Sequence, residues 1–177
     1  NGYDVIAQGN HIATSVKPGM ENESGELYVK GPNVFMEYLN NPTATKSTFS
    51  KDGWFKTGDT AMYKAGAYSI LGRTSVDIIK SGGYKISALD IERHLLTHPD
   101  IKDCVVVGLP DMTWGQRVAA IIIQKDGSTH INQQTLKKWA ADILPSYQIP
   151  SIVKVMDDIP KNAMGKVNKK LIVKNVF

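Results

Sequence analysis

The sequence predicts an α+β protein: a small β-rich subdomain joined by a hinge to a compact α/β domain, whose small sheet is flanked by helices. Two observations support this prediction. Early in the chain, short runs of alternating apolar and polar residues are separated by turns, whereas later segments alternate between strand-like and helix-like patterns. The change falls within residues 72–87, GRTSVDIIKSGGYKIS. We expect a β-rich part over residues 1–73, a hinge over residues 74–76 and an α/β domain over residues 77–177.

Length and composition indicate a soluble globular protein. The 177 residues are 42% hydrophobic, which is enough for a hydrophobic core. The longest apolar runs, residues 105–107 and 118–123, are far shorter than the ~20 residues of a membrane-spanning helix. The opening NGYDVIAQG shows no targeting peptide, and a start at Asn1 suggests an excised piece. The single cysteine, Cys104, lies in CVVVGL, which predicts a core residue and suits a reducing compartment.

The β-rich part has two predicted strands and one short helix. In GELYVKG, Leu27 and Val29 alternate with more polar neighbours, and residues 68–71 form a second strand-like run. Asn41 and Pro42 indicate a turn that leads into a helix from residue 43.

The α/β part begins with a predicted hairpin, because apolar residues 78–79 and 84–86 flank Gly82 and Gly83. Ser87 and Asp90 form a capping-box pattern at the start of a helix. The buried face of that helix is expected to contain Ala88, Ile91 and Leu95.

The remaining elements follow in order. Strands are predicted over residues 103–109 and 117–124, with the loop PDMTWGQ between them. Asn132 is expected to cap a second helix that stops at Pro145. Its apolar residues at helical spacing are Leu136, Trp139, Ala140 and Ile143. A strand over residues 152–156, the loop IPKNAMGK and a short basic helix complete the chain.

Two residues near the end of the β-rich part suit a sugar or phosphate ligand. Asp59 follows Gly58 in WFKTGD, and a carboxylate there can accept two hydrogen bonds from a sugar diol, although an Asp that closes its own turn is the commoner case. Arg73 directly precedes the change of domain, where its guanidinium can hold a ribose or a phosphate. An interdomain salt bridge explains Arg73 equally well.

Two lysines are further candidates. Lys166, after glycine in PKNAMGKV, can place its charge where negative charge develops on a phosphoryl or acyl oxygen, but a solvated loop lysine is the commoner case. The loop is not a Walker motif, because Pro160 and Val167 replace the required Gly and Ser or Thr. Lys80 lies near the two glycines of the hairpin, which leave room for a ligand along the backbone, although turn geometry also explains them.

Other charged groups suggest weaker alternatives. His94 and His98 stand four residues apart, but no third ligand is evident, so no metal site is expected. The chain ends in a basic tail that would attract phosphates or form a solvated face, with Lys161, Lys166, Lys169, Lys170 and Lys174. A non-catalytic basic binding module is therefore an alternative function. Aromatic residues are not interleaved with these lysines, and we expect no nucleic acid partner.

The order of these patterns is more specific than any one of them. GELYVKGPNVFMEY, WFKTGD, GRTSVDIIKSGGYKISALDIE, GLPDMTWGQRVAAIII and IPKNAMGKV resemble, in this order, the acyl-adenylate-forming family of acyl-CoA synthetases, luciferases and peptide-synthetase adenylation domains. The resemblance runs from about residue 25 to the C-terminus. SVDIIKSGGYKISALDIE and DMTWGQRVAA are most similar to the branch that ligates malonate or methylmalonate to coenzyme A.

The resemblance implies an ATP-dependent ligase with two half-reactions. A carboxylate attacks the α-phosphorus of Mg²⁺-bound ATP to give acyl-AMP, and coenzyme A then displaces AMP. Asp59 and Arg73 would hold the ribose, and Lys166 would bridge the carboxylate and the nucleotide as the catalytic lysine. A carrier-protein phosphopantetheine is the alternative acceptor.

The same resemblance implies that the small domain changes its orientation between the steps. Lys80, Gly82 and Gly83 would serve the thioester step, with Gly83 leaving room for the pantetheine arm. The domain would rotate about Ser75, where related enzymes usually have Asp or Lys.

The resemblance also implies that residues 1–73 are the last β-rich subdomain of a large adenylating domain that precedes this chain. That domain would bind most of the Mg²⁺-ATP and the acid, so the fragment alone is expected to form no acyl-AMP. We further expect an intracellular protein of the mitochondrial matrix, with a role in fatty acid and lipid metabolism. The sequence does not determine its oligomeric state.

Overall fold

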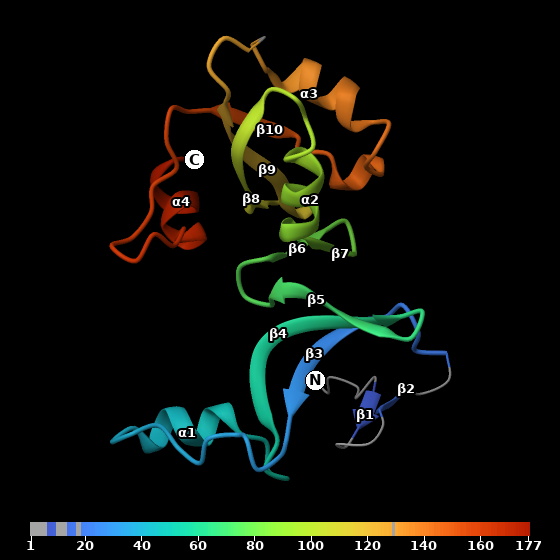
Figure 1. The fold of residues 1–177 in the computed structure, drawn as a ribbon, viewed down its shortest axis with the longest axis vertical. Helices are drawn as coiled ribbons and strands as arrows, with labels where there is room; N and C mark the ends of the chain where they lie inside the picture. The colour runs from blue at the N-terminus through green and yellow to red at the C-terminus, as the bar shows by residue number, and fades with distance from the viewer. Residues whose placement is uncertain (1–6, 10–13, 17–18, 129) are drawn as a thin grey trace. The chain divides into compact units, whose positions relative to one another are not determined.

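A computed structural model describes residues 7–9, 14–16, 19–128 and 130–177 (Figure 1). The chain divides into two compact units, Asn1–Ser75 and Val76–Phe177. The first contains small antiparallel sheets and the second a sheet with helices packed against it. The α+β fold class predicted from the sequence is confirmed.

The described residues of the first unit form two small antiparallel sheets. One pairs β1 (Ala7–Gly9) with β2 (Thr14–Val16), and the other has the order β3 (Ser24–Val29), β4 (Phe55–Lys64), β5 (Ala67–Arg73). The chain turns from β4 into β5 at Ala65 and Gly66, whose φ angles of 50° and 85° match the right-handed twist of a hairpin. As predicted, Asn41 begins a short helix, α1 (Pro42–Thr48), and its side chain accepts a hydrogen bond from the amide of Ala44.

The second unit is built around β9 (Gly115–Gln124). This strand pairs along its length with β8 (Ile101–Asp111), in parallel with β10 (Ile152–Val155), and at Gly115 with the end of β6 (Ile78–Ser81). The β6 strand also forms the predicted hairpin with β7 (Tyr84–Ser87). The strands β8 and β9 extend further into PDMTWGQ than predicted, so only residues 112–114 form the connecting loop.

Helices pack on both faces of this sheet because β8 and β9 are apolar on both sides. Alternate residues such as Val106 and Ile122 pack with α2 (Ala88–Leu95) and α3 (Gln133–Ala140). Their neighbours, such as Val105 and Ile121, pack with α4 (Lys169–Asn175) on the other face. Figure 1 shows α4 on the opposite side of the sheet from α2 and α3. The 3₁₀ turn Ser146–Gln148 lies between α3 and β10.

The predicted helix caps form, and one predicted helix end is wrong. The Ser87 hydroxyl accepts a hydrogen bond from the amide of Asp90, and Asn132 makes a full capping box with Thr135. However, α3 ends at Ala140 rather than near Pro145. Ile143, predicted on the apolar face, is 40% exposed, whereas Leu144 is 5% exposed, because the chain leaves the helix early and turns Leu144 into the core.

Cys104 is a core residue of β8, as predicted, and is only 5% exposed. Burial, together with the nearby Glu92 and Asp103 carboxylates, raises the pKa of its thiol to about 12. No helix among the described residues has the length and apolar character needed to cross a membrane.

Cys104 should therefore resist a thiol-specific reagent in the folded protein. With a pKa of about 12, only about one thiol in ten thousand is a thiolate at pH 8. We expect almost no reaction with an aromatic disulfide reagent at pH 8, and complete reaction of one thiol after denaturation. Rapid stoichiometric labelling under native conditions would contradict the burial of Cys104.

Candidate functional site

Asp59 and Arg73, the predicted ribose pair, lie opposite each other in the first unit. They are register partners on β4 and β5, so their side chains share one face, and Arg73 Nε lies 3.1 Å from Asp59 Oδ1. Arg73 also donates to the carbonyl of Thr57 at 2.6 Å. The Arg73 side chain is 60% exposed, so this surface pair adds at most about 1 kcal/mol to stability. The ion pair of Arg73 is thus formed with Asp59 of the same unit. Ribose binding by these two residues stays a prediction.

The residues beside Ser75 are anchored in different units. Thr74 donates its amide to the carbonyl of Gly58 at 2.9 Å, and its hydroxyl lies 2.8 Å from that of Thr60, so it belongs to the first unit. Asp77 accepts a hydrogen bond from the amide of Ala88 in the second unit. Ser75 is exposed between these anchors. This placement suits a pivot, whose action stays a prediction.

The β6–β7 hairpin presents Gly82 and Gly83 at its turn, with φ angles of 56° and 85°. A Cβ added at Gly82 would lie 3.1 Å from the ring of Trp114, so this glycine is needed for a close contact. A Cβ at Gly83 would meet nothing within 4 Å, so the space beside it is open. The exposed Lys80 is held through its amide, which donates to Gln116 Oε1 at 2.7 Å.

Exposed aromatic rings lie near this hairpin, which sequence reasoning did not single out. Trp114 is 57% exposed, in a loop held by Asp111 Oδ1, which accepts hydrogen bonds from the amides of Thr113 and Trp114. These bonds, the Trp114 one foremost, lower the pKa of Asp111. Tyr84 of β7 stacks on Tyr147, with ring centroids 4.2 Å apart. In the sequence, the position of Trp114 in the predicted loop PDMTWGQ was a signal that its ring would be exposed.

Lys166 lies at the end of a hydrogen-bonded turn rather than in an irregular loop. Asn162 Oδ1 accepts from the amides of Met164 and Lys166 at 3.0 and 2.9 Å, and the Asn162 amide donates to the Lys166 carbonyl. Gly165 has a φ of 74°, which the turn requires. The backbone of Lys166 is thus fixed while its side chain is exposed.

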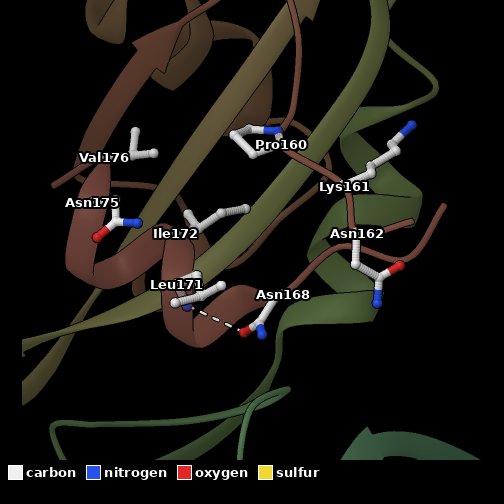
Figure 2. A pocket seen from close by; sticks show the side chains of 8 residues that line it. All are labelled: Pro160, Lys161, Asn162, Asn168, Leu171, Ile172, Asn175 and Val176. Atoms are coloured by element: carbon white, nitrogen blue, oxygen red, sulfur yellow. Dashed lines mark hydrogen bonds between the residues drawn. The ribbon is translucent and has the colours of Figure 1, made fainter. Parts of the chain in front are cut away.

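A pocket of about 170 Å³ lies between this turn and α4. Figure 2 shows its lining, in which the Asn168 side chain accepts a hydrogen bond from the amide of Leu171. The lining residues are Pro160, Lys161, Asn162, Asn168, Leu171, Ile172, Asn175 and Val176. None of the predicted site residues is among them.

Sequence reasoning missed a buried charge cluster formed by Lys169, Asp77 and Glu92. Lys169 Nζ lies 2.7 Å from Asp77 Oδ1 and 2.8 Å from Glu92 Oε1, and the three side chains are only 12%, 10% and 15% exposed. Assigning Lys169 to a solvated basic tail was therefore wrong. The signal was its position three residues before the buried Ile172, on the apolar face of α4.

Burial is the main influence on the pKa of Glu92 in this cluster. Burial raises the pKa of its carboxyl, and the ammonium of Lys169 opposes that shift. Glu92 Oε1 also accepts a hydrogen bond from the amide of Val106 at 2.7 Å, which ties α2 to β8.

The two histidines have local partners. His94 Nδ1 lies 2.8 Å from the carbonyl of Asp90, and His98 Nδ1 accepts from the amide of Asp100. Across the residues that the structure describes, no three His, Cys, Asp or Glu side chains are arranged to hold a metal ion.

Comparisons with known proteins give consistent results. Residues 90–166 match the C-terminal domain of AMP-binding enzymes. The chain is 54% identical over 175 residues to the mitochondrial malonate–CoA ligase of Mus musculus, an alignment that covers 99% of this chain and 30% of that protein. It is 45% identical to a malonate–CoA ligase of Arabidopsis thaliana, covering 88% of this chain and 27% of that protein. The chain thus spans about 30% of the length of these relatives.

Solved structures show the same fold. ATP-bound MatB from Rhodopseudomonas palustris superposes with a TM-score of 0.76 at 34% identity, over 87% of this chain and 30% of that one. The o-succinylbenzoate CoA synthetase of Bacillus subtilis, in complex with its acyl-adenylate intermediate, gives 0.76 at 33% identity, over 86% of this chain and 31% of that one.

Substitutions at Gly83 should reveal the backbone requirement of the hairpin. Gly83→Ala should destabilise the second unit by roughly 1 kcal/mol, because an L-residue is strained at a positive φ. Gly83→Asn adds the same Cβ but tolerates this conformation, so its cost should be smaller. Urea unfolding followed by circular dichroism gives both values. Equal losses for the two variants would contradict the positive φ.

Proposed function

We propose that the chain, whose residues 90–166 match the C-terminal domain of AMP-binding enzymes, is the C-terminal part of an AMP-forming acid–thiol ligase of that family. Such an enzyme activates a carboxylate as acyl-AMP and transfers the acyl group to coenzyme A. The observation that carries the proposal is the 54% identity to a malonate–CoA ligase across 99% of the chain.

In the proposed adenylation step, a carboxylate oxygen of the acid attacks the α-phosphorus of ATP. The bond from that phosphorus to the bridging oxygen breaks, and pyrophosphate leaves with the electron pair. The Lys166 ammonium would offset charge on the reacting oxygens, which suits a backbone fixed by Asn162 and a free side chain. Asp59, which is partly buried, and the exposed Arg73 would hold the ribose hydroxyls.

In the proposed thioester step, the sulfur of coenzyme A attacks the acyl carbon, loses its proton, and AMP leaves with the electrons of the broken carbon–oxygen bond. The open side of Gly83 and the exposed Lys80 would line the path of the pantetheine arm. Exposed rings such as Trp114 offer faces on which the adenine of coenzyme A can stack.

We propose that the two steps use different sides of the second unit. The Lys166 turn directly precedes α4, which lies on one side of the sheet, whereas the β6–β7 hairpin is paired with the start of β9 at Gly115 (Figure 1). A single active site would then receive one of them at a time, and rotation about Ser75, between the anchored Thr74 and Asp77, would exchange them.

For the substrate we propose malonate, with methylmalonate as a second acid, because relatives named malonate–CoA ligase align over nearly the whole chain. A carrier-protein thiol is the alternative acceptor. The relatives' mitochondrial location supports the same location here. Mg²⁺ would accompany ATP and be bound mainly outside this chain. The burial of Lys169 weakens the alternative of a basic binding module.

The catalytic assignment predicts a separation of the half-reactions. In the full-length protein, Lys166→Ala should lower acyl-AMP formation by roughly two orders of magnitude, because a transition-state donor is lost. Thioester formation from preformed acyl-AMP should largely survive. Carboxylate-dependent ATP–pyrophosphate exchange measures the first step and thioester yield the second. Lys174→Ala, an exposed lysine on α4, is the matched control and should change neither. An equal loss in both steps would refute the assignment.

The substrate proposal predicts a preference for malonate. A panel of malonate, methylmalonate, succinate, acetate and a long-chain acid should give the highest kcat/KM with malonate. The same panel run with free coenzyme A and with a phosphopantetheinylated carrier protein identifies the acceptor. A higher kcat/KM with acetate or a long-chain acid would contradict the proposal of malonate as the substrate. Activity with the carrier protein but not with free coenzyme A would contradict coenzyme A as the acceptor.

A further inference from the structure

The buried charge cluster has no role in the steps proposed above, yet it lies three residues from Lys166. Lys169 is the first residue of α4, directly after the turn and the cap residue Asn168. Asp77 lies just before β6, and Glu92 belongs to α2. One ammonium therefore joins the beginning of the terminal helix to two earlier parts of the domain.

Stability alone is a poor explanation for this cluster. Moving three charges out of water costs free energy, and apolar side chains of similar size often stabilise such a position equally well or better. Here the two carboxylates outnumber the single ammonium, and burial raises the pKa of Glu92. What buried ion pairs of this kind supply best is a defined geometry, because only close contacts offset the desolvation.

The contacts of the cluster fix Lys169 to rigid elements. Glu92 Oε1, which binds Lys169, also accepts the amide of Val106 in the middle of β8. Asp77 binds Lys169 through its side chain, while its carbonyl accepts the amide of Ala88 at 2.7 Å. Lys169 is thus held between the sheet and the start of α2.

We propose that Lys169, Asp77 and Glu92 are positioning residues for the adenylation step, which hold the turn that carries Lys166 at a fixed place on the domain. This inference rests on the proposed role of Lys166. The side chains need not touch the substrate. Their effect is to limit the displacement of the Lys166 ammonium, and misplacing a catalytic group by about 1 Å can cost on the order of a hundredfold in rate.

The Lys166 turn depends on the cluster more than the hairpin does. The hairpin has its own ladder of backbone pairs, and the amide of Gly82 also donates to the carbonyl of Trp114. Before the turn, Lys161 pairs with Asp103 at 3.4 Å, but both side chains are more than 40% exposed, so this link is weak. Loss of the cluster should therefore affect adenylation first.

The test uses the full-length protein with Asp77→Asn and Lys169→Met. Each should lower carboxylate-dependent ATP–pyrophosphate exchange by roughly ten- to a hundredfold, on the scale of a misplaced catalytic group. Thioester formation from preformed acyl-AMP should be largely retained, which a general loss of folding would not allow. Lys170→Met is the matched control, because Lys170 is the next residue of α4 and is exposed. It should change neither step.

Each result is decisive. Equal losses in both half-reactions, or unchanged adenylation in Asp77→Asn, would overturn the positioning role. If Lys169→Met does not fold, Asp77→Asn alone tests the positioning role, because this variant keeps the pair of one ammonium and one carboxylate formed by Lys169 and Glu92. Lys166→Ala is assayed in parallel. If Lys166→Ala leaves adenylation intact, the proposed function of Lys166 fails. If Lys166→Ala lowers adenylation while Asp77→Asn and Lys169→Met do not, only the positioning role is refuted.

Discussion

The second unit depends on the antiparallel pairing of β8 and β9, whose side chains are apolar on both faces. Because neither face can be left in water, α2 and α3 must cover one side and α4 the other. The β6–β7 hairpin and β10 then attach to β9. The sheet is thus the common frame on which the hairpin glycines and the turn of Lys166 are held.

In the second unit, a buried ion pair joins elements from the two faces of the sheet. Glu92 comes from α2 and Lys169 from α4, and Glu92 Oε1 both pairs with Lys169 and accepts a hydrogen bond from the amide of Val106 in β8. Such a contact is possible only when both helices are docked. Packing of the apolar faces and the geometry of the ion pairs therefore specify the same arrangement, which is the consistency expected of a well-defined fold.

The candidate site is divided between rigid and accessible parts. Side chains proposed to act on ligands, such as Arg73, Lys80 and Lys166, are exposed, while their backbones are fixed by strand pairing or by a hydrogen-bonded turn. In the proposed mechanism, the second unit carries two different sets of groups, the hairpin and the Lys166 turn. The proposed pivot, the exposed Ser75, lies between residues anchored in each unit.

The sequence by itself determined the features that depend on local chemistry: the hairpin glycines, the caps at Ser87 and Asn132, the alternating strands and the order of motifs that resembles the acyl-adenylate-forming family. Only the tertiary structure decided which charges are buried. Lys169 lies within a run of lysines, and its spacing of three residues from Ile172 is a weak local signal that does not identify its partners. Its burial results from the docking of α4 beside Glu92 and Asp77, which precede it in the chain by 77 and 92 residues. The early end of α3 at Ala140 has the same origin, because the core needs Leu144 rather than Ile143.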